Sequence, residues 1–417
     1  MSKSTPALKN SPVSRSADPL SFVRGLAPRI RELAGAAEAV SEIPAEITDA
    51  LYDEGIYSLM IPTALGGGYA GGEEAPPALI IDVLEELSAA DGSTGWAVMA
   101  PMSGMGTLLA ILPDDGVDRV LHSGNYRTAG QIAPTGTAVK VEGGYRISGR
   151  FTFASGSPTA NWFTGGFWLK DEDGEFVPGP SGPRQLVLGL VPRSGTSLDG
   201  GWDVLGFRAT ASVDYSFPEQ FLPEELVTDG AVKRGDTFHR GGVRLLTAIG
   251  HASVIHGIIR SSLEAFQKLS LEKRRAPNGG LLATHETVQR DFAIWKSRAD
   301  SAKAFTYRAF ETVYDVLRSG GTPTAAQEAD CRMAATQAAY LAPQLTQAVY
   351  LMSGSEGLRN SPDNVIQRAF RDAHAASQHA LTAEYVYVEA GRIYLDTPGM
   401  EETHYRILDH IFAPPLR

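Results

Sequence analysis

The segment AVKVEGGYRISGRFTFASG, residues 138–156, alternates apolar and polar side chains along most of its length. Val139 and Val141 begin the alternation, and Phe153 stands near its end. A period of two is typical of a half-buried β-strand, and the glycine pair that begins at Gly143 supplies the positive φ of a tight hairpin turn. The segment therefore predicts two antiparallel strands joined by a short turn.

Strand-like segments continue on the C-terminal side of this hairpin. They read WFTGGFWLK at residues 162–170, RQLVLGLVP at 184–192 and ASVDYSFPEQFLP at 211–223. Pro and Gly separate them throughout, as they do between the strands of a β-rich unit. The region from residue 123 to residue 235 is therefore predicted to be a middle β-domain.

Helical periodicity precedes this β-domain. In PALIIDVLEELSAADGSTGWAVMA, residues 77–100, apolar side chains recur at steps of three and four, and Pro77 suits the first turn of a helix. The DGST that begins at Asp91 ends this helix and offers a cap for the next one. An N-terminal helical domain is predicted over residues 18–122. Residues 1–17 are rich in Ser, Pro and Lys and are predicted to be a flexible tail.

Four long helical segments follow the β-domain. The first, VRLLTAIGHASVIHGIIRSSLEAFQKL at residues 243–269, has a broad apolar face, and the others cover residues 284–318, 324–352 and 362–395. Helices of this length and pattern indicate a four-helix bundle, predicted over residues 236–417. The chain is therefore expected to have an α+β fold, with helices, a β-domain and a helical bundle in that order.

Composition excludes several classes of function. The 417 residues carry a net charge of −11, which argues against nucleic acid as a partner because phosphate binding needs a concentrated basic face. The single cysteine, Cys331, makes neither an intrachain disulfide nor a cysteine-based metal site, and it favours a reducing, cytoplasmic compartment. Because no run of eighteen apolar residues occurs, no membrane span is expected. The first seventeen residues lack the apolar core of a secretory signal.

Short catalytic motifs are missing. The sequence has no Walker loop, no GxGxxG after a strand, no HExxH and no GxSxG elbow. His251 and His256 are five residues apart, as are His374 and His379, so each pair falls on different faces of a helix and no metal site is expected. Taken alone, the residues leave the chemistry open, and Ser155-Gly156 is interpreted as a turn.

The segment GWDVLGFRATASVDYSFPEQFLPEELV, residues 201–227, resembles a characteristic stretch of the acyl-CoA dehydrogenase superfamily. The matching positions are Trp202, Leu205, Gly206, Arg208, Thr210, Ser212 and Pro223. Together with the order of the three regions, this resemblance implies the acyl-CoA dehydrogenase-like fold and a flavin cofactor. It also implies a homotetramer.

Further positions are implied to bind the flavin. The strand that ends in FASG is similar to the strand of the family that carries an aromatic side chain and a hydroxyl beside the isoalloxazine ring, and a hydroxyl can donate or accept there. Arg274, or alternatively Arg275, lies where the family has an arginine that reaches the cofactor phosphate. The cofactor-binding residues expected from the resemblance are Phe153, Ser155, Gly156, Trp162, Arg274, Arg371 and His379.

The catalytic glutamate of the dehydrogenases has no counterpart. The positions that match it hold Ala380 and, in the other branches, Val243, and neither can accept a proton. The sequence is more similar to the two-component flavin-dependent monooxygenases in its DGSTGWA, in its FASG and in the spacing of Arg368, Arg371 and His379. In that branch, reduced FMN or FAD from a separate reductase reacts with O2 to give a C4a-(hydro)peroxyflavin.

The resemblance implies roles for individual side chains. Ser155 and His379 are expected to be catalytic, because a hydroxyl and an imidazole can stabilise the oxygen adduct. A small organic substrate, aromatic or polycyclic, is expected beside Trp96, His251 and His374. Phenol-hydroxylating members often carry a substrate-base histidine shortly after GSTGW, but this chain has PMSGMG at residues 101–106, so His251 is considered as a substitute or as a core residue.

Two alternatives remain open at the level of the sequence. The first is a dehydrogenase-like flavoprotein that oxidises a thioester with an unrecognised base. The second is an inactive flavin-fold binding protein, which the missing glutamate would also explain.

Overall fold

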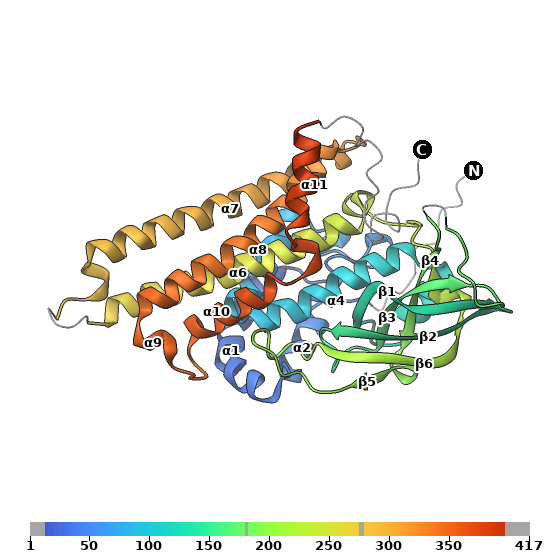
Figure 1. The fold of residues 1–417 in the computed structure, drawn as a ribbon, viewed down its shortest axis with the longest axis horizontal. Coiled ribbons are helices and arrows are strands. Elements are labelled where there is room, and N and C mark those ends of the chain that lie inside the picture. Colours follow the sequence, from blue (N-terminus) through green and yellow to red (C-terminus); the bar gives the residue numbers. More distant parts are fainter. Residues whose placement is uncertain (1–12, 180–181, 275–278, 397–417) are drawn as a thin grey trace.

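The computed structural model describes residues 13–179, 182–274 and 279–396, apart from the side chains of residues 243 and 244. Its helices and strands follow the order expected from the sequence, helices first, then a sheet, then a helical bundle (Figure 1). The first helices are α1 (Pro19–Val40), α2 (Ala45–Asp53), α3 (Pro77–Ala90), α4 (Gly92–Ile111) and α5 (Asp114–Leu121).

The glycine-rich segment between α2 and α3 contains only short 3-10 turns. These are η1 (Ile56–Ser58), η2 (Thr63–Leu65) and η3 (Ala70–Gly72). The chain between α2 and α3 is therefore an irregular connection.

The sheet contains seven strands in the order β5-β6-β2-β1-β3-β4-β7. Their bounds are β1 (Thr128–Val141), β2 (Gly144–Ala154), β3 (Trp162–Lys170), β4 (Leu186–Pro192), β5 (Ser197–Asp199), β6 (Val213–Pro223) and β7 (Val227–Thr228). The predicted hairpin is present, because β1 and β2 pair antiparallel up to Val141 and Gly144, and Gly143 in the turn has φ +73°. The pairing of β1 with β3 is parallel, and the short strands β5 and β7 were not expected.

The bundle is built from α6 (Val243–Glu272), α7 (Glu286–Arg318), α8 (Ala325–Ser353) and the shorter helices α9 (Ser355–Leu358), α10 (Val365–Ala376) and α11 (Tyr385–Tyr394). The 3-10 turns here and around the sheet are η4 (Arg193–Gly195), η5 (Glu224–Leu226), η6 (Phe238–Gly241), η7 (Leu282–Thr284) and η8 (Ala380–Thr382).

The prediction of one continuous helix over residues 362–395 is wrong. Helix α10 ends at Ala376, and the backbone of His379 is extended. The His379 side chain caps η8 by accepting a hydrogen bond from the Leu381 N–H. The hydroxyl of Ser377 also bonds back to the His374 carbonyl, which is an orphan acceptor at the helix end. Local side-chain bonds of this kind compete with the helix, and the break releases His379 from the helical surface.

Helix α4 is the element that joins the layers. It contacts both α6 and β1, and in Figure 1 it lies between the bundle helices and the sheet. Nearly all its residues are buried, which is why its sequence is apolar on every side. Asp91 caps its N-terminus by accepting the N–H of Thr94 at 2.8 Å, as the DGST segment predicts.

Close packing of α6 on α3 depends on Gly257. A Cβ at this position would lie 2.4 Å from Ser88 Cβ and 2.5 Å from the Glu85 carbonyl oxygen. Because backbone atoms of α3 occupy this space, only glycine fits here. The contact fixes the depth at which α6 sits against the N-terminal helices.

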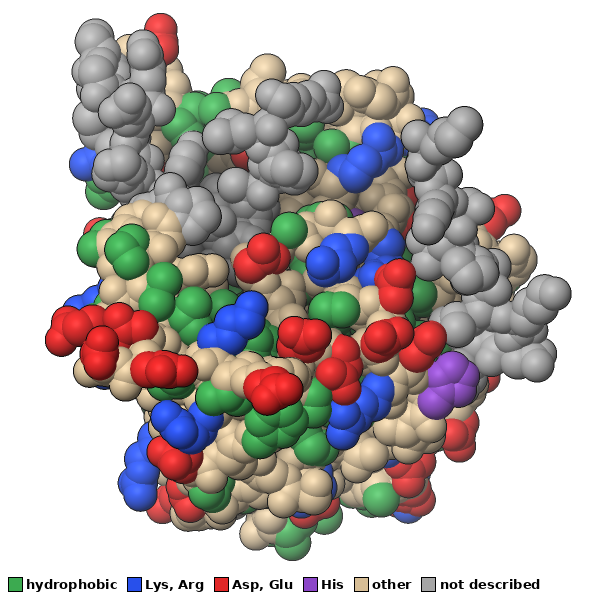
Figure 2. All heavy atoms as spheres, turned by 90° about the vertical axis from the view of Figure 1, so that its right-hand side faces the viewer, with side chains coloured by type: hydrophobic (Ala, Val, Ile, Leu, Met, Phe, Trp, Pro, Cys, Tyr) green, Lys and Arg blue, Asp and Glu red, His purple; other side chains and the backbone are tan. Residues whose placement is uncertain are grey.

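Charged side chains of both signs are interspersed on the face that carries the sheet, as seen from the right-hand side of Figure 1 (Figure 2). Single-sign patches do not dominate this view of the described residues. Within the described part of the chain, no helix combines the length and the apolar character that crossing a membrane requires.

Candidate active site

Trp96 on α4 and four side chains from other segments of the chain come together. We call this group, Trp96, Ser155, Ser212, His251 and His379, the Trp96 cluster. The indole N–H of Trp96 donates to Ser155 Oγ at 3.2 Å. Its ring lies 5.1 Å from the ring of His251 and 5.6 Å from that of His379, measured between centroids. The cluster therefore combines hydroxyls, imidazoles and an aromatic ring at the junction of the sheet and the bundle.

The end of strand β2 turns Ser155 toward α4. The pairing of β2 with β6 shifts between Phe151 and Ala154, as in a β-bulge, and Phe153 within the bulge has φ +64°. A left-handed conformation is unfavourable for a bulky residue, so the surrounding packing must enforce it. The Phe153 side chain is 62% exposed, whereas Ser155 is 7% exposed. The bulge thus presents an apolar ring outward and a hydroxyl inward, next to Gly156, whose N–H donates to the Thr210 carbonyl.

The hydroxyl groups of Ser155, Ser212 and Thr210 form a hydrogen-bonded chain. Ser155 Oγ lies 2.7 Å from Ser212 Oγ, which lies 2.6 Å from Thr210 Oγ1, and Thr210 donates to the Phe207 carbonyl at 2.9 Å. With Thr210 donating to that carbonyl, Ser212 donates to Thr210 and Ser155 donates to Ser212. The Phe207 carbonyl also accepts from the indole N–H of Trp202 at 2.8 Å. The chain can also run in the opposite direction, with Thr210 donating to Ser212, Ser212 donating to Ser155, and Ser155 donating to a ligand. The Phe207 carbonyl would then still accept the Trp202 N–H.

The loop that carries Thr210 and Ser212 is held by a buried carboxylate of α10. Asp372 accepts the Phe207 N–H at 2.6 Å, and its side chain is fully enclosed. Burial, together with the nearby Asp91 carboxylate, raises the pKa of Asp372 to about 7. Phe207 has φ +56°, a strained conformation that this bond helps to maintain. Its ring then packs 4.6 Å from Trp96, so the loop forms part of the wall around the cluster.

Among the residues that the structure describes, His251 has one paired ring nitrogen and one buried ring nitrogen without a partner. Its Nδ1 lies 2.7 Å from the Thr247 carbonyl oxygen, which can only accept, so Nδ1 carries the hydrogen. Its Nε2 is enclosed and unpaired among the described residues. Burial lowers the pKa of His251 to about 4, so the ring is neutral near pH 7 and Nε2 keeps its lone pair.

His379 stands against His251 with the opposite hydrogen-bonding pattern. The two ring centroids are 4.2 Å apart. His379 Nδ1 accepts the Leu381 N–H at 3.2 Å, so the neutral ring carries its hydrogen on Nε2. Burial, and then the neighbouring His251, lower the pKa of His379 well below its usual value. The pair thus offers one donor and one acceptor in the same small region.

Two other predicted site residues, Trp162 and Arg371, use their polar groups in hydrogen bonds within the protein. The indole N–H of Trp162 donates to Ser123 Oγ, so its only donor is in use. The Arg371 guanidinium is 8% exposed and binds both carboxylate oxygens of Glu38, at 2.9 and 2.8 Å. Both assignments to a flavin therefore stay predictions, and the visible role of Arg371 is to join α10 to α1.

Two more predicted residues lie apart from the Trp96 cluster. His374 bonds through Nδ1 to the Phe370 carbonyl at 2.7 Å and packs its ring against that of Phe370. Arg274 is exposed beyond the end of α6 and donates to the Gly279 carbonyl, while Arg275 lies outside the described residues. A cofactor phosphate at Arg274 stays a prediction.

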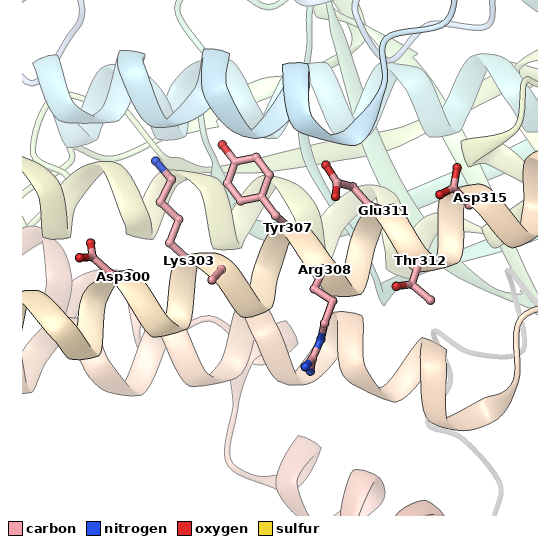
Figure 3. Close-up of a pocket in the computed structure, with 8 residues that line it drawn as sticks. Asp300, Lys303, Tyr307, Arg308, Glu311, Thr312 and Asp315 are labelled. Atoms are coloured by element: carbon pink, nitrogen blue, oxygen red, sulfur yellow. The ribbon is translucent and has the colours of Figure 1, made fainter.

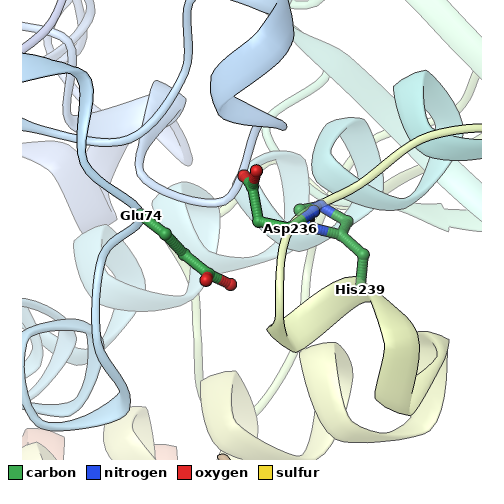
Figure 4. A group of neighbouring side chains, drawn as sticks. All are labelled: Glu74, Asp236 and His239. Atoms are coloured by element: carbon green, nitrogen blue, oxygen red, sulfur yellow. Dashed lines mark hydrogen bonds between the residues drawn. The ribbon is translucent and has the colours of Figure 1, made fainter. Parts of the chain in front are cut away.

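The carboxylates and imidazole of Glu74, Asp236 and His239 also come together, near the start of α6 (Figure 4). Their potential ligand atoms are already hydrogen-bonded. His239 Nδ1 accepts the Asp236 N–H, and its Nε2 lies 3.0 Å from the carbonyl of Met60. Glu74 accepts the N–H groups of Thr237 and Phe238, and Asp236 accepts the backbone N–H and the hydroxyl of Thr63. This arrangement fixes a loop and leaves no free imidazole lone pair for a metal ion.

A shallow groove follows the outer face of α7 (Figure 3). It is lined by Asp300, Lys303, Ala304, Tyr307, Arg308, Glu311, Thr312 and Asp315, all from that one helix. Lys303 forms an ion pair with the buried Glu85 at 2.6 Å, and the Tyr307 hydroxyl donates to Asp82. The groove is thus a charged surface that ties α7 to α3, and it contains none of the predicted site residues.

Comparison with known proteins identifies the class to which this fold belongs. Residues 249–384 match the family model described as acyl-CoA dehydrogenase, C-terminal domain. The structure of XiaF from Streptomyces sp. in complex with FADH2 and glycerol has the same fold, with a TM-score of 0.82, 21% identity and coverage of 91% of this chain and 95% of that one.

Two sequence relatives narrow the class. The indole-3-acetate monooxygenase of Pseudomonas putida is 26% identical over 374 residues, covering 88% of this chain and 90% of the relative. The pigment production hydroxylase of Rhodococcus sp. is 30% identical over 371 residues, covering 84% and 89%. The chain therefore belongs to the acyl-CoA dehydrogenase superfamily and, within it, to the two-component flavin-dependent monooxygenases, which confirms the fold class and the enzyme class expected from the sequence.

Sequence reasoning missed the parts of the site that depend on contacts distant in the chain. Thr210 and Ser212 stood in the motif of residues 201–227 but had no assigned role, although their spacing of two residues was a signal that both hydroxyls could face the same side. The pairing of His251 with His379 had no signal in the sequence, because the break after α10 was not foreseen.

Proposed function

We propose that this protein is the oxygenase component of a two-component system, which uses reduced FMN or FAD and O2 to add one oxygen atom to a small aromatic or polycyclic substrate. The observation that carries the proposal is the convergence of the Ser155 hydroxyl and the His379 imidazole on Trp96. At the position of the dehydrogenase base the chain has Ala380, which is exposed and holds no proton acceptor.

The residues around the cluster fit a reduced flavin. Phe153 and Leu205 leave apolar side chains 62% and 61% exposed beside the β2 bulge and the Phe207 loop, where they can cover the faces of a flat ring system. The Ser155 hydroxyl can bond a polar edge in either direction, because the hydroxyl chain behind it can reverse.

The flavin, when bound, supplies two electrons and the position at which oxygen is activated. The chain's own residues orient and protect that chemistry. Ser155 and the Nε2–H of His379 are donors for an oxygen atom that gains negative charge, and such preorganised donors contribute most where water is excluded. Because the pKa of His379 is lowered well below its usual value, it acts as a neutral donor near pH 7.

The electrons come from a separate flavin reductase. This part of the proposal is supported by the absence from the sequence of any GxGxxG after a strand, the motif that would hold a nicotinamide dinucleotide. Arg274 on the exposed end of α6 would bind the flavin phosphate, and the long bundle helices would assemble as a homotetramer. The relative that acts on indole-3-acetate supports a bicyclic aromatic substrate.

A single-turnover experiment tests the proposed function. The protein is loaded anaerobically with chemically reduced FMN or FAD and with indole as the probe, and then mixed with ¹⁸O2. We expect an oxygenated indole that carries one ¹⁸O, and we expect His379→Ala to oxidise the same flavin while releasing mainly hydrogen peroxide.

The dehydrogenase alternative predicts a different result in the same apparatus. Oxidised FAD on the protein would be bleached by butyryl-CoA without oxygen. That outcome, or the absence of ¹⁸O from every product of indole and related aromatic probes, would refute the proposal.

A further inference from the structure

Helix α6 comes close enough to α4 for a side chain of α6 to reach Trp96. A Cβ on Gly250 would lie 2.6 Å from Met99 Cγ, so glycine at this position lets the two helices touch. The next residue, His251, therefore stands beside Trp96, with 5.1 Å between the ring centroids. The imidazole of His251 thus lies against α4. The segment PMSGMG of α4, residues 101–106, contains no histidine of its own.

The environment of His251 determines what kind of group it can bind. Its side chain is 5% exposed, and its Nδ1–H is used by the Thr247 carbonyl of the preceding helical turn. Only the lone pair on Nε2 remains, and it has no partner among the described residues. A buried acceptor without a donor is unfavourable, so a ligand that brings a donor relieves that cost.

A second buried histidine on the same helix shows that this is not a general feature of α6. His256 Nε2 lies 2.8 Å from Thr306 Oγ1, so its ring is paired within the protein. The neighbours of His251 are the rings of Trp96 and His379, which favour a flat aromatic molecule. His379 has intermediate exposure and lies in the link between α10 and η8, so this link is the side from which a ligand can approach the cluster.

We propose that His251 determines specificity by accepting a hydrogen bond through Nε2 from an N–H or O–H group of the aromatic substrate. This inference rests on the proposed function, because the ligand is the substrate of that oxygenase. His251 then holds the substrate while the Nε2–H of His379 remains available to the oxygen. The preferred substrates are therefore aromatics that carry a hydrogen-bond donor, such as indoles and phenols, and their ethers and N-alkyl derivatives should bind more weakly.

Matched probes that differ only in the donor test this inference. Dissociation constants of indole and 1-methylindole, and of phenol and anisole, are measured by calorimetry on the protein loaded with reduced FMN under anaerobic conditions. We expect the wild-type protein to bind the donor member of each pair about tenfold more tightly, as one hydrogen bond to a buried acceptor allows. In His251→Phe the two members should bind within about twofold of each other.

Two further variants separate the role of the acceptor from the integrity of the fold. His251→Gln keeps an amide acceptor and should retain part of the preference for the donor probes. His256→Leu removes an equally buried imidazole whose Nε2 is already paired, and it should keep the wild-type preference.

An unchanged preference in His251→Phe would overturn the inference, and so would the failure of every donor probe to bind the wild-type protein. These outcomes are distinct from failure of the proposed function, because oxygen transfer is measured separately in the ¹⁸O2 experiment.

Discussion

Replacing Asp372 by Asn should change how the stability of the protein depends on pH. The carboxylate is buried, accepts the Phe207 N–H at 2.6 Å and has a pKa raised to about 7 by burial and by Asp91. A carboxyl group whose pKa is higher in the folded state binds more protons there, so stability is lost as pH rises from about 4 to about 7. A shift of about three units corresponds to at most about 4 kcal/mol.

The amide of Asn keeps the acceptor for Phe207 and removes the charge. Asp372→Asn should therefore be as stable as the wild-type protein near pH 4 and more stable at pH 8, by up to about 4 kcal/mol. Urea unfolding at pH 5, 6.5 and 8, at one protein concentration, measures the difference in free energy. Asp363→Asn, at an exposed position just before α10, is the control and should follow the wild-type profile. Parallel profiles for Asp372→Asn and the wild-type protein would refute the reasoning.

Three other predictions concern the site and the helix packing. Ser155→Ala should lower the yield of oxygenated product per flavin oxidised by about 10²-fold, because a preorganised donor is lost. Ser157→Ala is the control. It removes only a bond to a backbone carbonyl and should lower this yield by less than about tenfold. Gly257→Ala should lower the free energy of unfolding by about 1–3 kcal/mol despite the better helix propensity of Ala, and a Tm equal to that of the wild-type protein would contradict the close packing. Because the pKa of His379 is lowered well below its usual value, the same product yield should be flat from pH 6 to pH 8, and a transition near pH 6.5 would show a solvated imidazole instead.

The fold could be predicted from the sequence wherever a local pattern controls the chain. The alternation of apolar and polar residues around Gly143 predicts the hairpin. Apolar residues at steps of three and four predict α3, α4 and the long bundle helices. The prediction of one continuous helix over residues 362–395 was wrong, because the helical periodicity of the apolar residues continues through the break. At the break, the His379 side chain accepts the backbone N–H of Leu381, and a local bond of this kind competes with the helix.

The site was only partly accessible to the same reasoning. Ser155, His379 and Trp96 were expected from a resemblance, and the structure brings them together. The bond from Phe207 to Asp372 joins residues far apart in the chain, and no local pattern encodes it. The strained backbone of Phe153 is equally hidden, because sequence rules assign a left-handed conformation to glycine or asparagine before an aromatic residue.

The Trp96 cluster draws its side chains from the N-terminal helices, the sheet and both ends of the bundle. A fragment that ends before His379 lacks part of the cluster, so the donors of the proposed function come together only after the whole bundle has been made. Under the proposed function, we therefore expect oxygenation to require a chain in which the helices, the sheet and the bundle are all folded.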